Sequence, residues 1–120
     1  ILVTDDEPDM VTWLTTFLED NGYNTITAND GIECFEKAKS EHPDLITLDV
    51  AMDRQSGMKT LKQLQEFEGT SNIPIIIITG MSTDLKGFIR RTKSVEFPQG
   101  FIEKPVDRDE LLRTVRKLLT

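Results

Sequence analysis

The 120-residue sequence has few of the residues on which several kinds of site depend. It contains one cysteine and one histidine, so an internal disulfide and a zinc site of thiolates and imidazoles are both excluded. No apolar run approaches the roughly 20 residues that a membrane-spanning helix needs. The 14 Lys and Arg residues are outnumbered by 21 Asp and Glu residues, which argues against direct binding of nucleic acid by this domain. We therefore expect a cytoplasmic domain with no membrane partner.

The sequence has enough apolar material for one packed domain. Hydrophobic residues make up 38% and charged residues 29% of the chain, a balance typical of globular proteins rather than of disordered tails. Its length lies within the roughly 100–200 residues of a single domain. We predict one domain over residues 1–120, and the surplus of carboxylates is compatible with a hard cation.

Five short apolar segments recur along the chain and predict strands. The first, third and fourth carry consecutive β-branched or leucine residues, a pattern typical of strands buried on both faces of a parallel sheet. The second and fifth are more polar, which suits strands at the edges of the sheet. In chain order the predicted strands are Ile1–Thr4, Asn24–Ala28, Leu45–Leu48, Ile75–Thr79 and Gly100–Glu103.

Between the predicted strands, apolar residues recur at a spacing of three or four, which indicates amphipathic helices. Pro8 suits the first turn of the first helix, Gly22 suits its end, and Asp107 suits the N-cap of the last. Strand and helix alternate five times. We therefore predict a single three-layer, doubly wound α/β domain with a five-stranded parallel sheet and five helices. The helical patterns cover residues 10–18, 32–38, 58–67, 85–89 and 111–119.

Polar residues follow four of the predicted strands at the point where each strand ends. They are Asp5 and Asp6, then Asp49, Thr79 and Lys104. In an open α/β sheet the carboxyl ends of the strands meet at one edge, where ligands bind. Carboxylates about 4 Å apart repel by roughly 4 kcal/mol at an effective dielectric of about 20, unless a cation or a proton lies between them. The pattern favours Mg²⁺ at this edge and an aspartate that attacks a phosphoryl donor.

These residues lie in motifs that resemble those of response-regulator receiver domains of two-component signalling. The resemblance covers essentially the whole chain and implies the flavodoxin-like strand order 2-1-3-4-5. It also implies a phosphorylation switch, a phosphoprotein rather than an enzyme that turns over a metabolite. The motifs are Val3–Pro8, Leu48–Met52, Gly57, Thr79-Gly80 and Lys104-Pro105.

The resemblance implies a role for each residue at the sheet edge. Asp49 corresponds to the phosphoacceptor, which takes a phosphoryl group from a sensor histidine kinase or a histidine phosphotransfer protein. The corresponding Mg²⁺ ligands, direct or through water, are the carboxylates of Asp5, Asp6 and Asp49 and the backbone carbonyl of Ala51. Lys104 corresponds to the ion-pair partner, whose bond to the following proline is commonly cis.

The resemblance also implies how the signal leaves the site. Thr79 corresponds to the hydroxyl that turns toward the phosphoryl group, and Phe101 to the aromatic that moves inward with it. The fourth helix, fifth strand and fifth helix would form the face that binds a downstream output domain or protein, or a second copy of the chain after phosphorylation. Two features depart from the family pattern. Asp53 stands where proline is common, and the segment 82–100 is longer than usual.

Three other functions fit parts of the pattern. An aspartyl-phosphate phosphohydrolase would need a second acid/base carboxylate close after the nucleophile, and Asp53 is a poor candidate. A domain that only mediates contacts would not need the complete set of strand-end residues. A flavin-binding role is disfavoured because no phosphate-binding loop rich in Gly, Ser or Thr follows the first strand.

Overall fold

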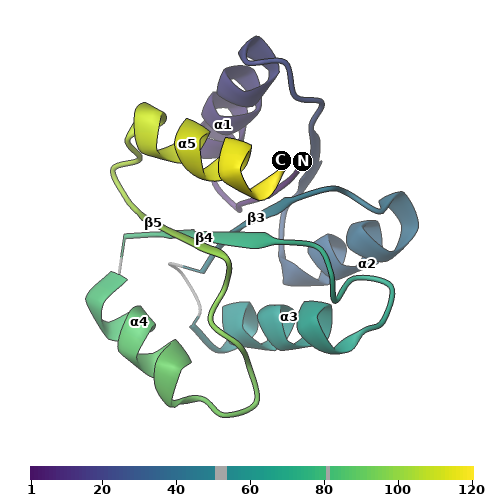
Figure 1. The fold of residues 1–120 in the computed structure, drawn as a ribbon, viewed down its shortest axis with the longest axis vertical. Helices are drawn as coiled ribbons and strands as arrows, with labels where there is room; N and C mark the ends of the chain where they lie inside the picture. The colour runs from purple at the N-terminus through teal and green to yellow at the C-terminus, as the bar shows by residue number, and fades with distance from the viewer. Residues whose placement is uncertain (51–53, 81) are drawn as a thin grey trace.

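Within residues 1–50, 54–80 and 82–120, which the structure describes, the computed structural model shows a parallel sheet with helices on both faces (Figure 1). The strand order is β2-β1-β3-β4-β5, so the predicted fold class and strand order are both confirmed. The strands are β1 (Leu2–Thr4), β2 (Ile26–Ala28), β3 (Ile46–Asp49), β4 (Ile75–Thr79) and β5 (Gly100–Glu103). The helices are α1 (Pro8–Asp20), α2 (Gly31–Glu41), α3 (Arg54–Glu66), α4 (Ser82–Arg91) and α5 (Arg108–Leu118).

The sheet separates two apolar clusters, because alternate residues of a strand point to opposite faces. In β4, Ile75 and Ile77 join the cluster that packs against α2, α3 and α4, whereas Ile76 and Ile78 join the cluster against α1 and α5. Figure 1 shows the same three layers, with α1 and α5 on one side of the sheet and the other three helices on the opposite side. The run of consecutive isoleucines is therefore explained by burial on both faces.

The helix ends follow the local sequence closely. Asp107, predicted as an N-cap, accepts hydrogen bonds from the backbone N–H groups of Asp109 and Glu110. Gly22 follows the end of α1 with a φ of 92°, in the left-handed region that glycine tolerates. The predicted boundaries are off by a few residues at β2, which begins at Ile26, and at α4, which begins at Ser82. None of the described helices is long and apolar enough to cross a membrane.

The parallel register brings the ends of the strands to one edge. Thr4 pairs with Leu48, so Asp5, which follows β1, lies beside Asp49, the last residue of β3. Thr79, the last residue of β4, pairs with Glu103, the last residue of β5. All of these positions lie at the carboxyl edge, where the sequence analysis predicts the functional residues.

Two helical glycines in different surroundings test the packing of the helices on the sheet. A Cβ on Gly57 of α3 would lie 2.3 Å from Val50 Cγ1, whereas a Cβ on Gly87 of α4 would approach only the flexible end of Arg91, at 3.0 Å. We expect Gly57→Ala to lower the free energy of unfolding by about 1–3 kcal/mol, because α3 must shift. Gly87→Ala should raise it by about 0.5–1 kcal/mol through helix propensity.

Urea unfolding followed by circular dichroism measures both changes. Equal effects of the two substitutions would contradict the close approach of α3 to the end of β3.

Candidate functional site

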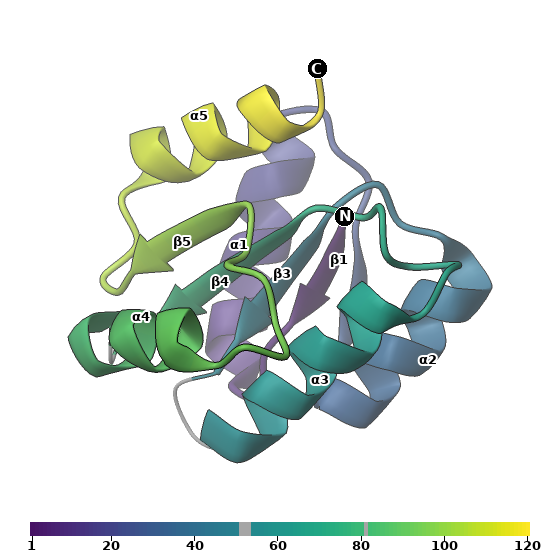
Figure 2. The ribbon, with the colours of Figure 1, turned by 60° about the horizontal axis from the view of Figure 1, so that its bottom comes forward.

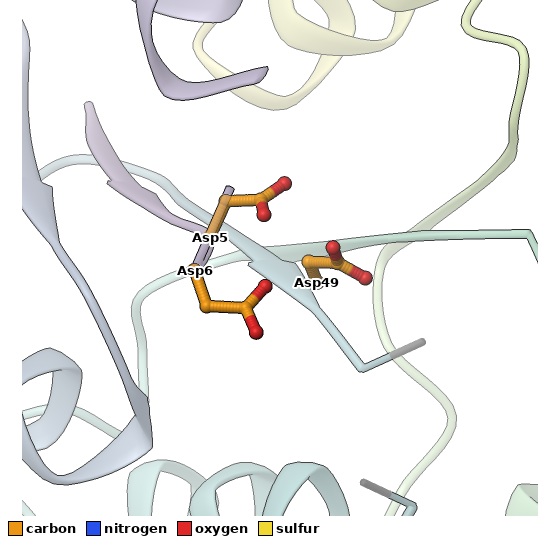
Figure 3. Close-up of side chains that lie close together, drawn as sticks. All are labelled: Asp5, Asp6 and Asp49. Atoms are coloured by element: carbon orange, nitrogen blue, oxygen red, sulfur yellow. The ribbon is translucent and has the colours of Figure 1, made fainter. Parts of the chain in front are cut away.

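Three carboxylates lie together at the carboxyl ends of β1 and β3. Figure 3 shows the side chains of Asp5, Asp6 and Asp49 close to one another. Each offers one carboxylate oxygen, and these oxygens lie within 4.8 Å of one another. Their exposures differ, because Asp5 is buried, Asp49 is half-buried and Asp6 is exposed. The three carboxylates therefore lie close together, as the sequence predicts.

Asp5 is held at the start of the loop between β1 and α1. Asp5 is 3% exposed, and its backbone N–H donates to the carbonyl of Ala28 at 3.2 Å. Its Oδ1 accepts a hydrogen bond from the backbone N–H of Glu7 at 2.9 Å. Its Oδ2 is buried and has no hydrogen-bond partner among the described residues. An orphaned buried carboxylate oxygen is costly unless a cation or proton compensates it.

Lys104 supplies a positive charge to the carboxylates from the end of β5. Its Nζ donates a hydrogen bond to Asp49 Oδ2 at 2.9 Å and lies 3.9 Å from Asp5 Oδ2. Its backbone N–H donates to the carbonyl of Thr79 at 2.8 Å, which fixes the end of β5 against β4. The bond to Pro105 is cis, as the family resemblance implies.

Burial and charge shift the proton affinities of two groups at this edge. Burial, together with the charge of Asp49, raises the pKa of Asp5 to about 6, although the hydrogen bond from Glu7 and the charge of Lys104 act to lower it. For Lys104, burial acts to lower the pKa, but the hydrogen bond and charge of Asp49 outweigh it. The pKa of Lys104 is therefore raised, and this amine stays charged at neutral pH.

The donor set fits a magnesium ion. Three carboxylates face one amine, so the described side chains leave a surplus of negative charge when all are ionised. All three offer oxygen atoms, the ligands that Mg²⁺ prefers, and the orphaned Asp5 Oδ2 is buried among them. A cavity of about 230 Å³ opens beside the carboxylates toward α2 and α3. Ala51, whose carbonyl was predicted as a further ligand, and Asp53 lie outside the described residues.

Thr79 and Phe101 lie on the strands next to this edge. Thr79 is fully buried at the end of β4, and Phe101 is half-buried on β5, where it pairs with Ile77. Because side chains alternate along a strand, Thr79, Ile77 and Phe101 share one face of the sheet. The roles predicted for Thr79 and Phe101 stay predictions, but their placement suits a connection between the edge and α4.

The sequence analysis missed two hydroxyl residues that line the cavity. Ser56 and Thr60 lie on α3 and face it together with Gly31 of α2. A Cβ on Gly31 would lie 2.0 Å from Thr60 Oγ1, so this glycine permits the close approach of the two helices. The sequence feature that could have indicated these two residues is their spacing of four positions, which puts both on one side of a helix.

The fold and the acidic edge together define a flavodoxin-like α/β domain with an oxygen-lined site, and comparisons with known proteins identify its family. A family model described as the response regulator receiver domain matches residues 1–116. The chain is 30% identical over 119 residues to protein PilH of Pseudomonas aeruginosa, covering 99% of this chain and 96% of PilH. It is 46% identical over 79 residues to the alkaline phosphatase synthesis transcriptional regulatory protein PhoP of Bacillus subtilis, covering 66% of this chain and 32% of PhoP.

A solved structure supports the same assignment. The chemotaxis response regulator CheY4 of Vibrio cholerae matches with a TM-score of 0.82 and 28% identity, covering 98% of this chain and 96% of that one. The chain belongs to the response-regulator receiver domain family. It is therefore a receiver domain of two-component signalling, a class that acts as a signalling switch and interacts with histidine kinases and output domains.

The raised pKa of Asp5 predicts how stability depends on pH. Its ordinary pKa of 3.8 rises to about 6 on folding. At pH values between these two pKa values, the folded protein therefore keeps a proton that the unfolded chain has lost. This contribution to the free energy of unfolding is complete below the ordinary pKa and is lost as the pH rises through about 6. Asp5→Asn should therefore stabilise the protein by about 1–3 kcal/mol at about pH 8 in EDTA, and progressively less toward about pH 4.5.

Urea unfolding of the parent and of Asp5→Asn across this pH range measures the gap, with exposed Asp20 changed to Asn as the matched control. A gap that stays constant with pH, or that favours the parent at high pH, would contradict the burial of Asp5 as a carboxylate.

Proposed function

We propose that Asp49 is the phosphoacceptor of this receiver domain. The observation that supports it most is the position of its carboxylate, which is hydrogen-bonded to Lys104 and lies within 4.8 Å of the oxygens of two further aspartates. In the proposed reaction a carboxylate oxygen of Asp49 attacks the phosphorus of a phosphohistidine on a sensor histidine kinase or a histidine phosphotransfer protein. The P–N bond breaks, the imidazole leaves with the electron pair, and Asp49 becomes an acyl phosphate.

The other residues at the edge would help to neutralise negative charge during this transfer. Asp5, Asp6 and Asp49 would hold Mg²⁺, with the backbone carbonyl of Ala51 as a further ligand. When bound, the ion neutralises negative charge on the phosphoryl oxygens. Lys104 would donate a hydrogen bond to a phosphoryl oxygen in place of the one it now donates to Asp49.

The product of this reaction would be a signal rather than a released metabolite. Thr79 would turn its hydroxyl toward the phosphoryl group, and Phe101 would move into the space beside it, because both lie on the same face of β4 and β5. The change would alter the face formed by α4, β5 and α5, which would bind a downstream output domain or protein, or a second copy of the chain. The single cysteine is buried and free, which supports a cytoplasmic location.

The phosphoacceptor is tested by intact-mass analysis. After incubation with a small acyl phosphate and Mg²⁺, the parent should gain the mass of one phosphoryl group, and Asp49→Asn should gain none because the nucleophilic carboxylate is gone. Asp20→Asn, which changes an exposed aspartate on α1, should gain the group like the parent. Excess EDTA should lower the parent's phosphorylated fraction at least tenfold, since roughly 1.4 kcal/mol of lost transition-state stabilisation suffices for that.

Two results would contradict the proposal. Equal labelling of Asp49→Asn and the parent would place the phosphoryl group elsewhere. A parent that takes up no phosphoryl group from either a small donor or a phosphohistidine protein would favour a domain that only mediates contacts.

A further inference from the structure

The segment between α4 and β5 is hydrogen-bonded to α3. Figure 2 shows the chain leaving α4, turning beside α3 and then entering β5. The side chain of Gln65 makes two hydrogen bonds of 2.8 Å to the backbone of Glu96, donating to its carbonyl and accepting from its N–H. Gln99 accepts a hydrogen bond from the backbone N–H of Ile75 at 2.9 Å. Hydrogen bonds from both sides therefore fix Phe97, which lies between Glu96 and Gln99.

Phe97 stacks on Phe101, the residue that corresponds to the family's switch aromatic. The two ring centroids are 5.8 Å apart, with an angle of 23° between the ring planes. Phe97 is 37% exposed, and the guanidinium carbon of Arg90 lies 5.1 Å from its ring centroid. The outer side of Phe97 thus remains open to solvent while it contacts Phe101.

A second contact holds Phe101 from α4. The Nζ of Lys86 lies 5.1 Å from the Phe101 ring centroid and 3.9 Å from Glu103 Oε1. The ring of Phe101 is therefore contacted both by an aromatic ring and by an amine that is itself paired with β5. Stacked aromatic pairs and cation–π contacts each favour the ring position that makes them.

We propose that Phe97 is a positioning residue that sets how readily Phe101 moves. This inference rests on the proposed function, in which Phe101 changes position with Thr79. The stack stabilises the position of Phe101 seen here, and any inward movement of its ring must break it. A ligand that favours a different position of Phe101 must overcome this stabilisation. The stack therefore lowers the affinity of the domain for such a ligand. Removing the Phe97 ring should therefore make the domain easier to switch.

The test is an equilibrium titration with beryllium trifluoride, a tetrahedral mimic of the phosphoryl group, in the presence of Mg²⁺. Isothermal titration calorimetry gives the dissociation constant for the parent and each variant. Phe97→Leu should bind about threefold to tenfold more tightly, because the aromatic stack is lost. Phe97→Tyr keeps the ring and should bind like the parent. Arg90→Gln, which keeps both rings but removes the guanidinium, should bind about twofold more tightly.

Phe67→Leu is the matched control, because Phe67 is 45% exposed and makes its ring contact with Phe35 of α2 instead. It should bind the mimic like the parent. If the parent binds and Phe97→Leu binds equally or more weakly, the inference is wrong and the proposed function stands. If Phe97→Tyr tightens binding as much as Phe97→Leu, the stack is not the cause and the inference is wrong. If the parent does not bind the mimic at all, the proposed function fails, and the inference fails with it.

Discussion

Mutual repulsion among three carboxylates is the constraint on which the rest of the site depends. Asp5, Asp6 and Asp49 bring oxygens within 4.8 Å of one another, a distance at which each pair of full charges repels by roughly 3–4 kcal/mol at an effective dielectric of about 20. One ammonium group, from Lys104, compensates part of this. The raised pKa of Asp5 is the visible consequence of its burial and of the remaining charge. A divalent cation placed among these carboxylates would relieve their mutual repulsion.

The sheet brings the carboxylates and the α4–β5 surface into one structural unit. Asp49 ends β3, Thr79 ends β4, and Lys104 follows β5, so three adjacent strands meet at the carboxylates. Phe101 lies on β5 below the same edge and contacts Phe97 and α4. Thr79 and Phe101 therefore share one face of the sheet, and on that face Phe101 contacts Phe97 and α4. A small change at the edge can bias these contacts, because packed aromatic contacts are either made or broken.

Much of this arrangement could be predicted from the sequence, for reasons that particular residues make plain. The buried isoleucines of β4 and the amphipathic spacing between strands required an α/β domain, and parallel strands necessarily bring Asp5, Asp49 and Lys104 to one edge. The strand order came from the family resemblance, since periodicity does not specify which strands are neighbours. The contacts of Gln65 with Glu96, 31 residues apart, could not be predicted, because no local pattern indicates which polar side chains meet across a fold. The start of α4 was placed late because its first turn, Ser82 to Asp84, carries no apolar residue.

The most direct test of the account is a crystal structure of the protein grown with Mn²⁺, whose anomalous scattering locates the ion in place of Mg²⁺. We expect a single strong anomalous peak among the carboxylates of Asp5, Asp6 and Asp49, with ligand oxygens of these residues or their bound waters around it. The amine of Lys104 should lie beside the ion without binding it. A peak at another place on the molecule, or carboxylates that turn away from one another with no ion between them, would contradict it.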